Sequence, residues 1–252
     1  MLIDDLGEPV PLSGAPARVV SLVPSLTDAI ETSRPGTVVG ATDYCTHPGS
    51  LDVPRVGGSK YPTVDAVLEL RPDLVVANAE ENRPDDVARI RADGIPVWVT
   101  AAAATVPDGL GSVRRLLTQG LDLEEPDWLV EAEDVWRSPA PVWARAVVPV
   151  WRRPWVVLGR DTFAGDVLWR LGVANVYADD AERYPRPPLA ELNAAGADLV
   201  VLPDEPYEFS ASDGPEAFPG LRYALVNGRE LTWCGPSLAA AHPTLTSALH
   251  LV

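Results

Sequence analysis

Cysteine is scarce in this chain: 252 residues contain Cys45 and Cys234 and no others. Two thiols are too few for the disulfide framework of a small secreted domain. No run of about 18 uncharged apolar residues occurs, so no membrane-spanning helix is expected. The motifs G-x-G-x-x-G, P-loop, G-x-S-x-G and H-E-x-x-H are also missing, which argues against a nucleotide enzyme.

Positive charge is equally scarce. The sequence has 20 Lys and Arg against 36 Asp and Glu, for a formal net charge of −16. Nucleic acids and anionic membranes both require a positive surface, so neither is an expected partner. The charge permits docking onto a basic partner surface and otherwise favours solubility.

The first residues, MLIDDL, have neither a basic segment nor an apolar core. We therefore expect no signal peptide, and the predicted location is the cytoplasm. A periplasmic or cell-surface location is the alternative if the true start lies upstream.

Two stretches of the chain share one pattern. Residues 73–82 read DLVVANAEEN and residues 198–209 read DLVVLPDEPYEF. Each predicts a strand buried on both faces that runs into an acidic loop. Because ligands of open parallel sheets bind outside the carboxyl ends of the strands, the pattern predicts two similar lobes that each present a loop.

Strand and helix patterns alternate along the chain, which predicts an α/β fold with mainly parallel sheets. We expect an N-terminal α/β lobe over residues 1–122, a helical linker over 123–149 and a C-terminal α/β lobe over 150–252. Two helices, 127–137 and 142–146, are predicted in or beside the linker, which shows no strand pattern.

In the C-terminal lobe, residues 155–158 are expected to form the first strand. Residues 223–226 form a later strand, and Asn227-Gly228 predicts a hairpin turn after it. Residues 231–233 would then complete the sheet.

Several segments resemble the class III substrate-binding proteins, also called the helical-backbone metal receptor superfamily. The matching segments are residues 18–27 (RVVSLVPSLT), 39–48 (VGATDYCTHP), 56–58 (VGG), 63–82 (TVDAVLELRPDLVVANAEEN) and 94–99 (GIPVWV), with looser matches at 161–175, 184–185 and 197–202. The resemblance is nearest to the vitamin B12-binding branch. It implies two Rossmann-like lobes that a long helix joins and a ligand cleft between the lobes. Pro139 and Pro141 predict that the joining helix is short or broken.

The resemblance also implies a function. We expect a non-catalytic protein that binds a metal chelate or corrinoid of the cobalamin, siderophore or haem type, with no cofactor besides that ligand. It would act as a cytoplasmic carrier or sensor, or with an ABC transporter permease. Two alternatives remain: a metal-handling protein or enzyme that uses Cys45, His47 and Cys234, and a degenerate family member that binds proteins through its acidic loops.

The expected ligand contacts follow from the same resemblance and from residue chemistry. Tyr44 occupies the position where the vitamin B12-binding branch has a cleft tyrosine, and a flat ring suits a flat macrocycle. Packing within the protein is the alternative for Tyr44 and for Trp233. Arg160 opens a helix and suits an anionic group, or else it pairs with Asp161 or Glu205. The full set of expected contacts is Pro24, Ser25, Tyr44, Cys45 and Gly58 in the first lobe and Arg160, Asp161, Glu205, Tyr207 and Trp233 in the second.

Cys45, His47 and Cys234 are the softest metal donors in the chain, with the two cysteines expected on opposite lobes. Buried structural thiols are the alternative, because a structural zinc site usually has four protein ligands.

Two pairs of acids, Glu80-Glu81 and Asp204-Glu205, lack an accompanying nucleophile or base motif and are not expected to be catalytic. In the family, one acid on each lobe docks onto arginines of the transporter. Glu81 and Glu191 lie near the corresponding positions, with solvated loop or helix-terminal acids as the alternative.

Overall fold

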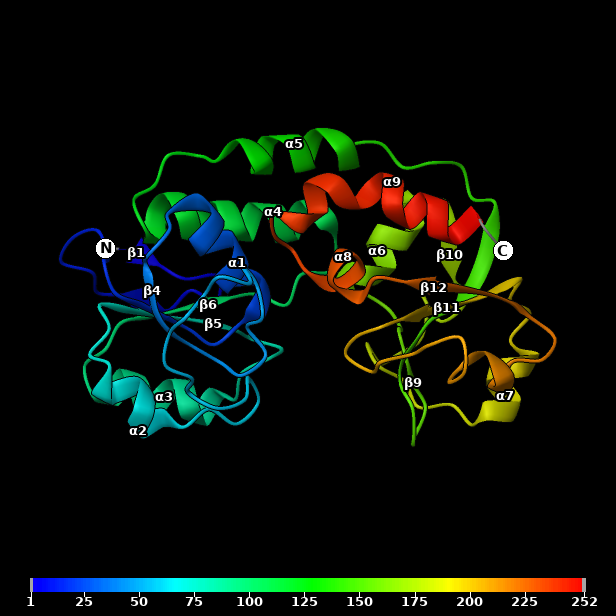
Figure 1. The fold of residues 1–252 in the computed structure, drawn as a ribbon, viewed down its shortest axis with the longest axis horizontal. Coiled ribbons are helices and arrows are strands. Elements are labelled where there is room, and N and C mark those ends of the chain that lie inside the picture. Colours follow the sequence, from blue (N-terminus) through cyan, green and yellow to red (C-terminus); the bar gives the residue numbers. More distant parts are fainter. Residues whose placement is uncertain (1, 251–252) are drawn as a thin grey trace. The chain divides into compact units, whose positions relative to one another are not determined.

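The structure, a computed structural model, describes residues 2–250 of the chain. These residues form two compact units (Figure 1). Unit 1 comprises residues 2–102, 109–130 and 234–236, and unit 2 comprises residues 103–108, 131–233 and 237–250. Two helices, α4 (Val106–Arg115) and α5 (Asp127–Trp136), each begin in one unit and end in the other.

Unit 1 contains a four-stranded sheet in the order β4-β3-β5-β6. All neighbouring strands are parallel, as the alternation of strand and helix patterns predicts. The strands are β3 (Val19–Ser21), β4 (Val38–Ala41), β5 (Leu74–Asn78) and β6 (Val97–Thr100), and a separate antiparallel hairpin is formed by β1 (Leu2–Ile3) and β2 (Pro9–Val10).

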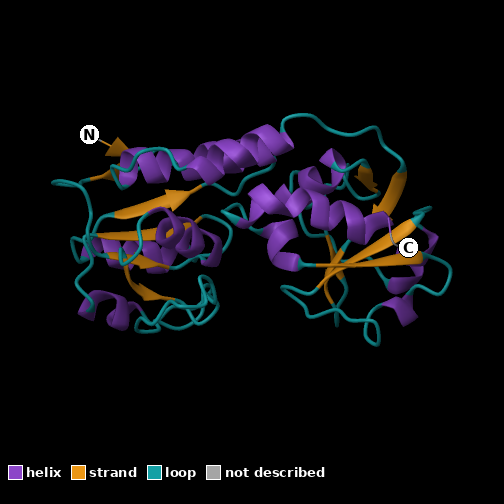
Figure 2. Ribbon diagram, turned by 45° about the horizontal axis from the view of Figure 1, so that its top comes forward, coloured by secondary structure: helices purple, strands orange, loops and turns teal. Residues whose placement is uncertain are grey.

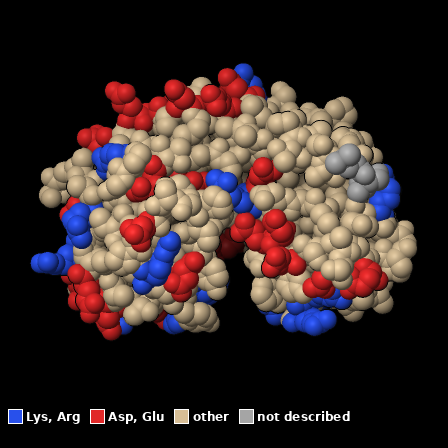
Figure 3. All heavy atoms as spheres, in the orientation of Figure 1, with Lys and Arg blue, Asp and Glu red and all other residues tan. Residues whose placement is uncertain are grey.

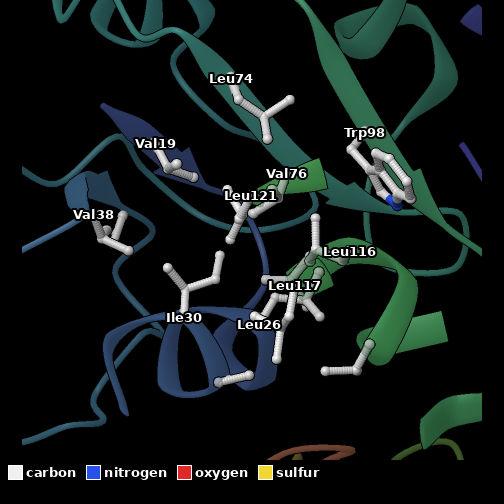
Figure 4. Packing of buried hydrophobic residues seen from close by; sticks show 14 of the residues in the cluster. Val19, Leu26, Ile30, Val38, Leu74, Val76, Trp98, Leu116, Leu117 and Leu121 are labelled. Atoms are coloured by element: carbon white, nitrogen blue, oxygen red, sulfur yellow. The ribbon is translucent and has the colours of Figure 1, made fainter. Parts of the chain in front are cut away.

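One face of this sheet packs against α1 (Pro24–Ser33) and the π-helix η1 (Leu116–Gly120). Leu74 and Val76 of β5 point into this cluster, together with Trp98 of β6 (Figure 4). All three side chains have no exposed surface. The cluster therefore forms half of the core of unit 1.

The opposite face packs against α2 (Val64–Glu69) and α3 (Pro84–Ala92). Here β5 contributes Val75 and Ala77, which are also fully buried. Helices thus lie on both faces of the sheet (Figure 2). A strand that is covered on both sides has no polar alternation, which explains the continuous apolar run in the sequence.

Unit 2 contains a second four-stranded parallel sheet, in the order β10-β7-β11-β12. A short antiparallel hairpin of β8 and β9 lies outside this sheet. The strands are β7 (Ala144–Val147), β8 (Pro149–Trp151), β9 (Val156–Val157), β10 (Val173–Asn175), β11 (Leu199–Pro203) and β12 (Arg222–Val226).

The remaining helices belong to unit 2. They are α6 (Phe163–Arg170), α7 (Leu189–Ala194), the 3-10 helix η2 (Pro215–Ala217), α8 (Gly228–Thr232) and α9 (Ser237–His250). Leu192 of α7 packs on one face of the sheet against Val200 and Leu202 of β11. Across residues 2–250, no helix combines the length and the apolar character that crossing a membrane requires.

The two sheets have the same topology. In each, the second strand along the chain lies at one edge, followed by the first, third and fourth. The aspartate before the third strand has the same role in both units. Asp73 Oδ2 accepts hydrogen bonds from the N–H groups of Ala17 and Arg18 at 3.0 and 2.9 Å, and Asp198 Oδ2 accepts one from Arg145 N–H at 2.9 Å. The DLVV pattern therefore marks a true structural repeat, and the expected α/β class with two parallel sheets is confirmed.

The predicted helix over residues 142–146 is wrong, because Ala144–Val147 forms β7 in the middle of a sheet. This strand pairs with β10 on one side and β11 on the other, which satisfies its buried backbone groups. It lies within the segment 123–149 that the sequence predicts to be a helical linker. The predicted helix over 127–137 is confirmed as α5, which ends before Pro139.

Two further predictions for unit 2 are wrong. Residues 155–158 do not open the sheet; they contribute β9 to the separate hairpin. Asn227-Gly228 is not a hairpin turn, because Asn227 Oδ1 accepts a hydrogen bond from Glu230 N–H at 3.0 Å and caps α8. An N-terminal cap of this kind directs residues 228–232 into a helix.

The repeat predicts that Asp73→Ala and Asp198→Ala both destabilise the protein. Each substitution leaves backbone N–H groups at the start of a neighbouring strand without a protein acceptor. We expect a loss of about 0.5–1.5 kcal/mol in the free energy of unfolding for each, since these bonds are exposed and water partly replaces the lost acceptor. Urea denaturation measures it. Asp52→Ala, at an exposed position, is the matched control and should change little. Two variants as stable as the control would contradict the structural role of the repeat.

Candidate ligand-binding site

The loops that follow the strands of unit 1 lie together at the carboxyl edge of its sheet. They are residues 22–23 after β3, 42–63 after β4, 79–83 after β5 and 101–102 after β6. This edge is where open parallel sheets bind ligands. It is therefore the place to look for a site in unit 1.

Two asparagines hold these loops. Asn78, at the end of β5, donates from Nδ2 to Thr100 Oγ1 at 3.0 Å and to the carbonyl oxygen of Ala101 at 3.1 Å. Its Oδ1 accepts a hydrogen bond from Glu80 N–H at 2.8 Å. Asn82 Oδ1 in turn accepts from Asn78 N–H at 2.7 Å. At this end of the sheet, the two side chains bond to backbone groups that no longer have a neighbouring strand as partner.

Two exposed tyrosines lie on the loop after β4. Tyr61 and Tyr44 are 71% and 66% exposed, more than any other large hydrophobic side chain in residues 2–250. Tyr44 rests on Gly58, where an added Cβ would lie 3.4 Å from its ring. The guanidinium of Arg83 lies 5.4 Å from the centre of the Tyr61 ring, within the range of a cation–π contact.

The predicted contacts Pro24 and Ser25 also reach this edge. Pro24 is the first residue of α1, directly after the loop that follows β3, and both residues are half-buried. The carbonyl oxygen of Ser25 lies close to Gly235, where an added Cβ would be 3.2 Å away. The structure thus brings Pro24, Ser25, Tyr44 and Gly58 to one edge of one unit.

Cys45 also follows β4, but its thiol is fully buried. Its Sγ lies 3.1 Å from Thr27 Oγ1 and 3.2 Å from Thr42 Oγ1. Burial raises the pKa of the Cys45 thiol, while the threonine hydroxyls oppose this change. The thiol is therefore protonated and packed in the core at neutral pH.

The expectation that the two cysteines occupy opposite lobes is wrong. Residues 234–236 belong to unit 1, and Cys234 packs against the same core cluster as Cys45. The third expected donor, His47, has its Nδ1 3.1 Å from Thr46 Oγ1. Within residues 2–250, no three His, Cys, Asp or Glu side chains are grouped so that they would hold a metal ion.

Glu81 is half-buried on the loop after β5. Burial, and after it the neighbouring Glu80, raise the pKa of its carboxyl group from 4.5 to about 7, against the lowering effect of Lys60. The backbone N–H of Glu81 lies 3.3 Å from Asn78 Oδ1. The asparagine pair thus fixes the position of an acid that titrates near neutral pH.

At the carboxyl edge of unit 2, Asp204 and Glu205 follow β11. Asp204 Oδ1 accepts a hydrogen bond from Gly228 N–H at 2.5 Å, and Gly228 packs so closely on Glu205 that a Cβ would lie 2.4 Å from its Cγ. Trp233 donates a hydrogen bond to the Glu205 carboxylate. Burial and Asp204 raise the pKa of Glu205, against the lowering effect of Trp233 and Arg229. The predicted residues Glu205 and Trp233 are therefore neighbours.

Tyr207 belongs to a different cluster. Its hydroxyl donates to Asp213 Oδ2 at 2.6 Å, and its ring contacts Phe209 and Trp151 with centroid distances of 4.6 and 5.7 Å. Asp213 also forms an ion pair with Arg152. Structural packing of the loop explains these contacts.

Arg160 and Asp161 pair with each other, with Nε 2.6 Å from Oδ2. Both side chains are more than half exposed. Asp161 has a left-handed backbone conformation with φ of 51°, and its carbonyl oxygen accepts a hydrogen bond from Arg183. This pair corresponds to the alternative in which Arg160 bonds to Asp161 and not to an anionic ligand.

The chain is similar in sequence to characterised binding proteins and similar in fold to several solved structures. No family model matches the chain. It is 22% identical over 179 residues to the vitamin B12-binding protein of Vibrio cholerae serotype O1, covering 67% of this chain and 64% of that protein. The match therefore spans less than two thirds of the relative's length.

Two solved structures show the fold. The periplasmic heme-binding protein of Roseiflexus sp. RS-1 has a TM-score of 0.75 and 22% identity, covering 94% of this chain and 98% of that chain. Helicobacter pylori Ceue with Ni(II) bound has a TM-score of 0.80 and 13% identity, covering 99% of this chain and 88% of that chain. This chain has the class III substrate-binding protein fold. The resemblance in the sequence is thereby confirmed.

Within this class III fold, sequence reasoning missed Asn78, Asn82 and Tyr61. Asn78 and Asn82 flank the two glutamates of the DLVVANAEEN stretch. The sequence pattern predicts roles for these glutamates and not for the asparagines. Tyr61 follows the matched VGG turn by three positions. An amide directly after a doubly buried strand is the signal that would have found Asn78.

The pKa of Glu81 predicts how stability depends on pH. Between about pH 4.5 and 7 the folded state holds a proton that the unfolded state releases, so stability falls as pH rises. Glu81→Gln removes this loss and should be more stable than the wild type at pH 8 and equal to it at pH 4. The gain is below about 3 kcal/mol, since one pKa unit corresponds to about 1.4 kcal/mol and solvent screens a half-buried charge.

Urea unfolding at pH 4, 6 and 8 provides the measurement. Glu69→Gln, at an exposed position on α2, is the matched control and should follow the wild-type pH profile. A Glu81→Gln profile parallel to that of the wild type would show that the carboxyl group titrates normally.

Proposed function

We propose that the chain is a non-catalytic binding protein for a metal chelate or corrinoid, and that the carboxyl edge of unit 1 contributes the principal contacts. The observation that carries this proposal is the exposure of Tyr44 and Tyr61 on the loop after β4. Exposed large rings are unfavourable in water and mark binding surfaces when they are grouped. Flat rings suit flat macrocycles, because they contribute large contact area with little loss of side-chain entropy.

The chemistry of the same edge favours binding over catalysis. Its thiol, Cys45, is buried and protonated, so it is a poor nucleophile. Among the relatives and structural neighbours, several are named as vitamin B12-binding or heme-binding proteins, one as a possible iron-binding protein, and one structure holds Ni(II). A metal-handling protein that uses Cys45, His47 and Cys234 receives no support from the geometry of the described residues.

Two acids suit docking onto an ABC transporter permease. Glu191 is exposed in the first turn of α7, the helix before β11. The equivalent helix of unit 1 is α2, before β5, where the position that corresponds to Glu191 is Ala66 and the acid in the first turn is its neighbour Asp65. Asp65 is 71% exposed and pairs with Arg89. Glu81 instead is half-buried. We therefore place the docking acids at Asp65 and Glu191, with Glu81 left to the ligand edge.

The surface charge of the protein and the location of a structural neighbour indicate which partners and which compartment are expected. Acidic side chains gather over α5 (Figure 3), where Asp127, Glu131, Glu133 and Asp134 lie. Such a surface disfavours nucleic acid. The heme-binding neighbour from Roseiflexus is periplasmic, which supports the periplasmic alternative over the cytoplasmic assignment.

The proposal predicts that Tyr44→Ala and Tyr61→Ala each weaken binding of the preferred chelate about tenfold, or about 1.4 kcal/mol. Hemin, cyanocobalamin and a ferric siderophore are the probes, with calorimetry and visible absorption as readouts. Tyr223→Ala, an exposed tyrosine on β12, is the matched control. Asp65→Arg and Glu191→Arg should also leave affinity unchanged, because docking acids do not touch the ligand.

Failure of all three probes to bind the wild type at micromolar concentration would count against the proposed function. Equal affinity of the tyrosine variants and the wild type would instead move the site away from this edge of unit 1.

A further inference from the structure

Three consecutive residues of the turn Gly57–Pro62 contact the loop after β5. Ser59 carbonyl oxygen accepts a hydrogen bond from Asn82 Nδ2 at 2.9 Å. Lys60 Nζ donates to the carbonyl oxygen of Glu80 at 3.0 Å. The ring of Tyr61 lies under the guanidinium of Arg83. Ser59, Lys60 and Tyr61 therefore each contact a residue of the loop after β5.

Asn82 is the buried member of this set, with 6% of its surface exposed. Its Nδ2 donates to Ser59 and also to the carbonyl oxygen of Leu22, at 3.2 Å, in the loop after β3. Its Oδ1 accepts from Asn78 N–H. One side chain thus ties together the loops after three neighbouring strands and uses every amide atom to do so.

The base of the turn is closed by the antiparallel bridge between Gly57 and Pro62 and by Thr63 N–H, which donates to the carbonyl oxygen of Val56 at 2.7 Å. Asp43 N–H donates to the carbonyl oxygen of Gly57 at 2.9 Å.

At the tip, Ser59 Oγ lies 3.4 Å from Thr42 Oγ1, and Ser59, Lys60 and Tyr61 place no side chain in the core clusters. Lys60 and Tyr61 contact the neighbouring loop from exposed positions, where such contacts are weak. The part-buried bond from the buried Asn82 side chain to Ser59 is therefore the contact expected to contribute most to the conformation of the tip.

We propose that Asn82 is a positioning residue, which holds the turn Gly57–Pro62 and with it the ring of Tyr61 in the arrangement that binds ligand. The role rests on the proposed function, because it concerns the same edge of unit 1. Ordering a loop before the ligand arrives removes the entropic cost of ordering it during binding. Asn82 acts through the turn and does not need to touch the ligand.

The test uses Asn82→Ala and Asn82→Asp in the full chain. Alanine removes all side-chain bonds, whereas aspartate keeps the acceptor for Asn78 N–H and sets a carboxylate oxygen against the carbonyl oxygens of Ser59 and Leu22. Hydrogen exchange of residues 57–61 and of Thr63, whose N–H donates to Val56, should speed up about tenfold or more in both variants. Asn193→Ala is the matched control, because Asn193 Nδ2 also bridges two carbonyl oxygens, those of Leu189 and Ala217, at 3.0 Å each.

Ligand affinity distinguishes a positioning role of Asn82 from a general effect on the stability of the protein. Asn82→Ala should lower the affinity for hemin or cyanocobalamin about tenfold. Combined with Tyr61→Ala, it should cost little more than the larger single effect, because both variants remove the same contact. Should Asn82→Ala not fold, Lys60→Ala loosens the turn from an exposed position and should give a smaller change of the same kind.

Unchanged exchange of residues 57–61 and 63, or additive effects of Asn82→Ala and Tyr61→Ala on affinity, would overturn the role of Asn82. If the wild type binds neither probe, the proposed function fails and the ligand role of Asn82 fails with it. The exchange experiment would still show whether Asn82 holds the turn, so the two failures are distinguishable.

Discussion

Burial of β5 and β11 on both faces is the constraint on which each unit depends. Once helices cover both sides of a parallel sheet, the backbone of its central strands has no access to water except at the ends. Polar groups must then be satisfied at those two ends. Asp73 and Asp198 do this at the start of each strand by accepting hydrogen bonds from the neighbouring strand. The carboxyl ends need a different solution, and there the two units diverge.

In unit 1 the solution is a pair of neutral amides. Asn78 and Asn82 bond to one another and to the loops on either side, without placing a charge in the buried space. An amide both donates and accepts, so a single residue type satisfies carbonyl oxygens and N–H groups together. The same bonds hold the turn that presents Tyr61. The bonds that satisfy the polar groups at the end of β5 therefore also position the exposed ring of Tyr61.

The doubly buried strands were predictable because their apolar runs are long and are followed by polar loops. The strand β7 was not, although Ala144-Arg145-Ala146-Val147 repeats the Ala17-Arg18-Val19-Val20 of the first unit. Its run follows the break at Pro139 and Pro141 and contains a central arginine, so it resembled a short helical piece. Its place in the sheet comes from pairing with two distant strands, which no local pattern contains.

The same limit applies to the candidate site. The sequence predicts Tyr44 as a ligand contact from its position after a matched strand, and it predicts Glu205 and Trp233 as separate contacts that the fold makes neighbours. Asn82 was missed because an asparagine in an acidic loop has the pattern of a solvated residue. Only the tertiary structure shows that its side chain is buried and bridges three loops.

The comparison of the two carboxyl ends shows where the units have specialised. In the repeat, Pro203 occupies the position of Asn78, and Tyr207 that of Asn82. Proline has neither an N–H nor an amide side chain, so an asparagine pair cannot form after β11. Unit 2 instead uses carboxylates, with Asp204 bonded to Gly228 and Tyr207 bonded to Asp213. Equivalent strands therefore end in chemically different arrangements: an asparagine pair after β5, and a carboxylate bonded to Gly228 after β11. Because the strands are fixed by burial and the loops are not, the loops are where a shared fold acquires its ligand.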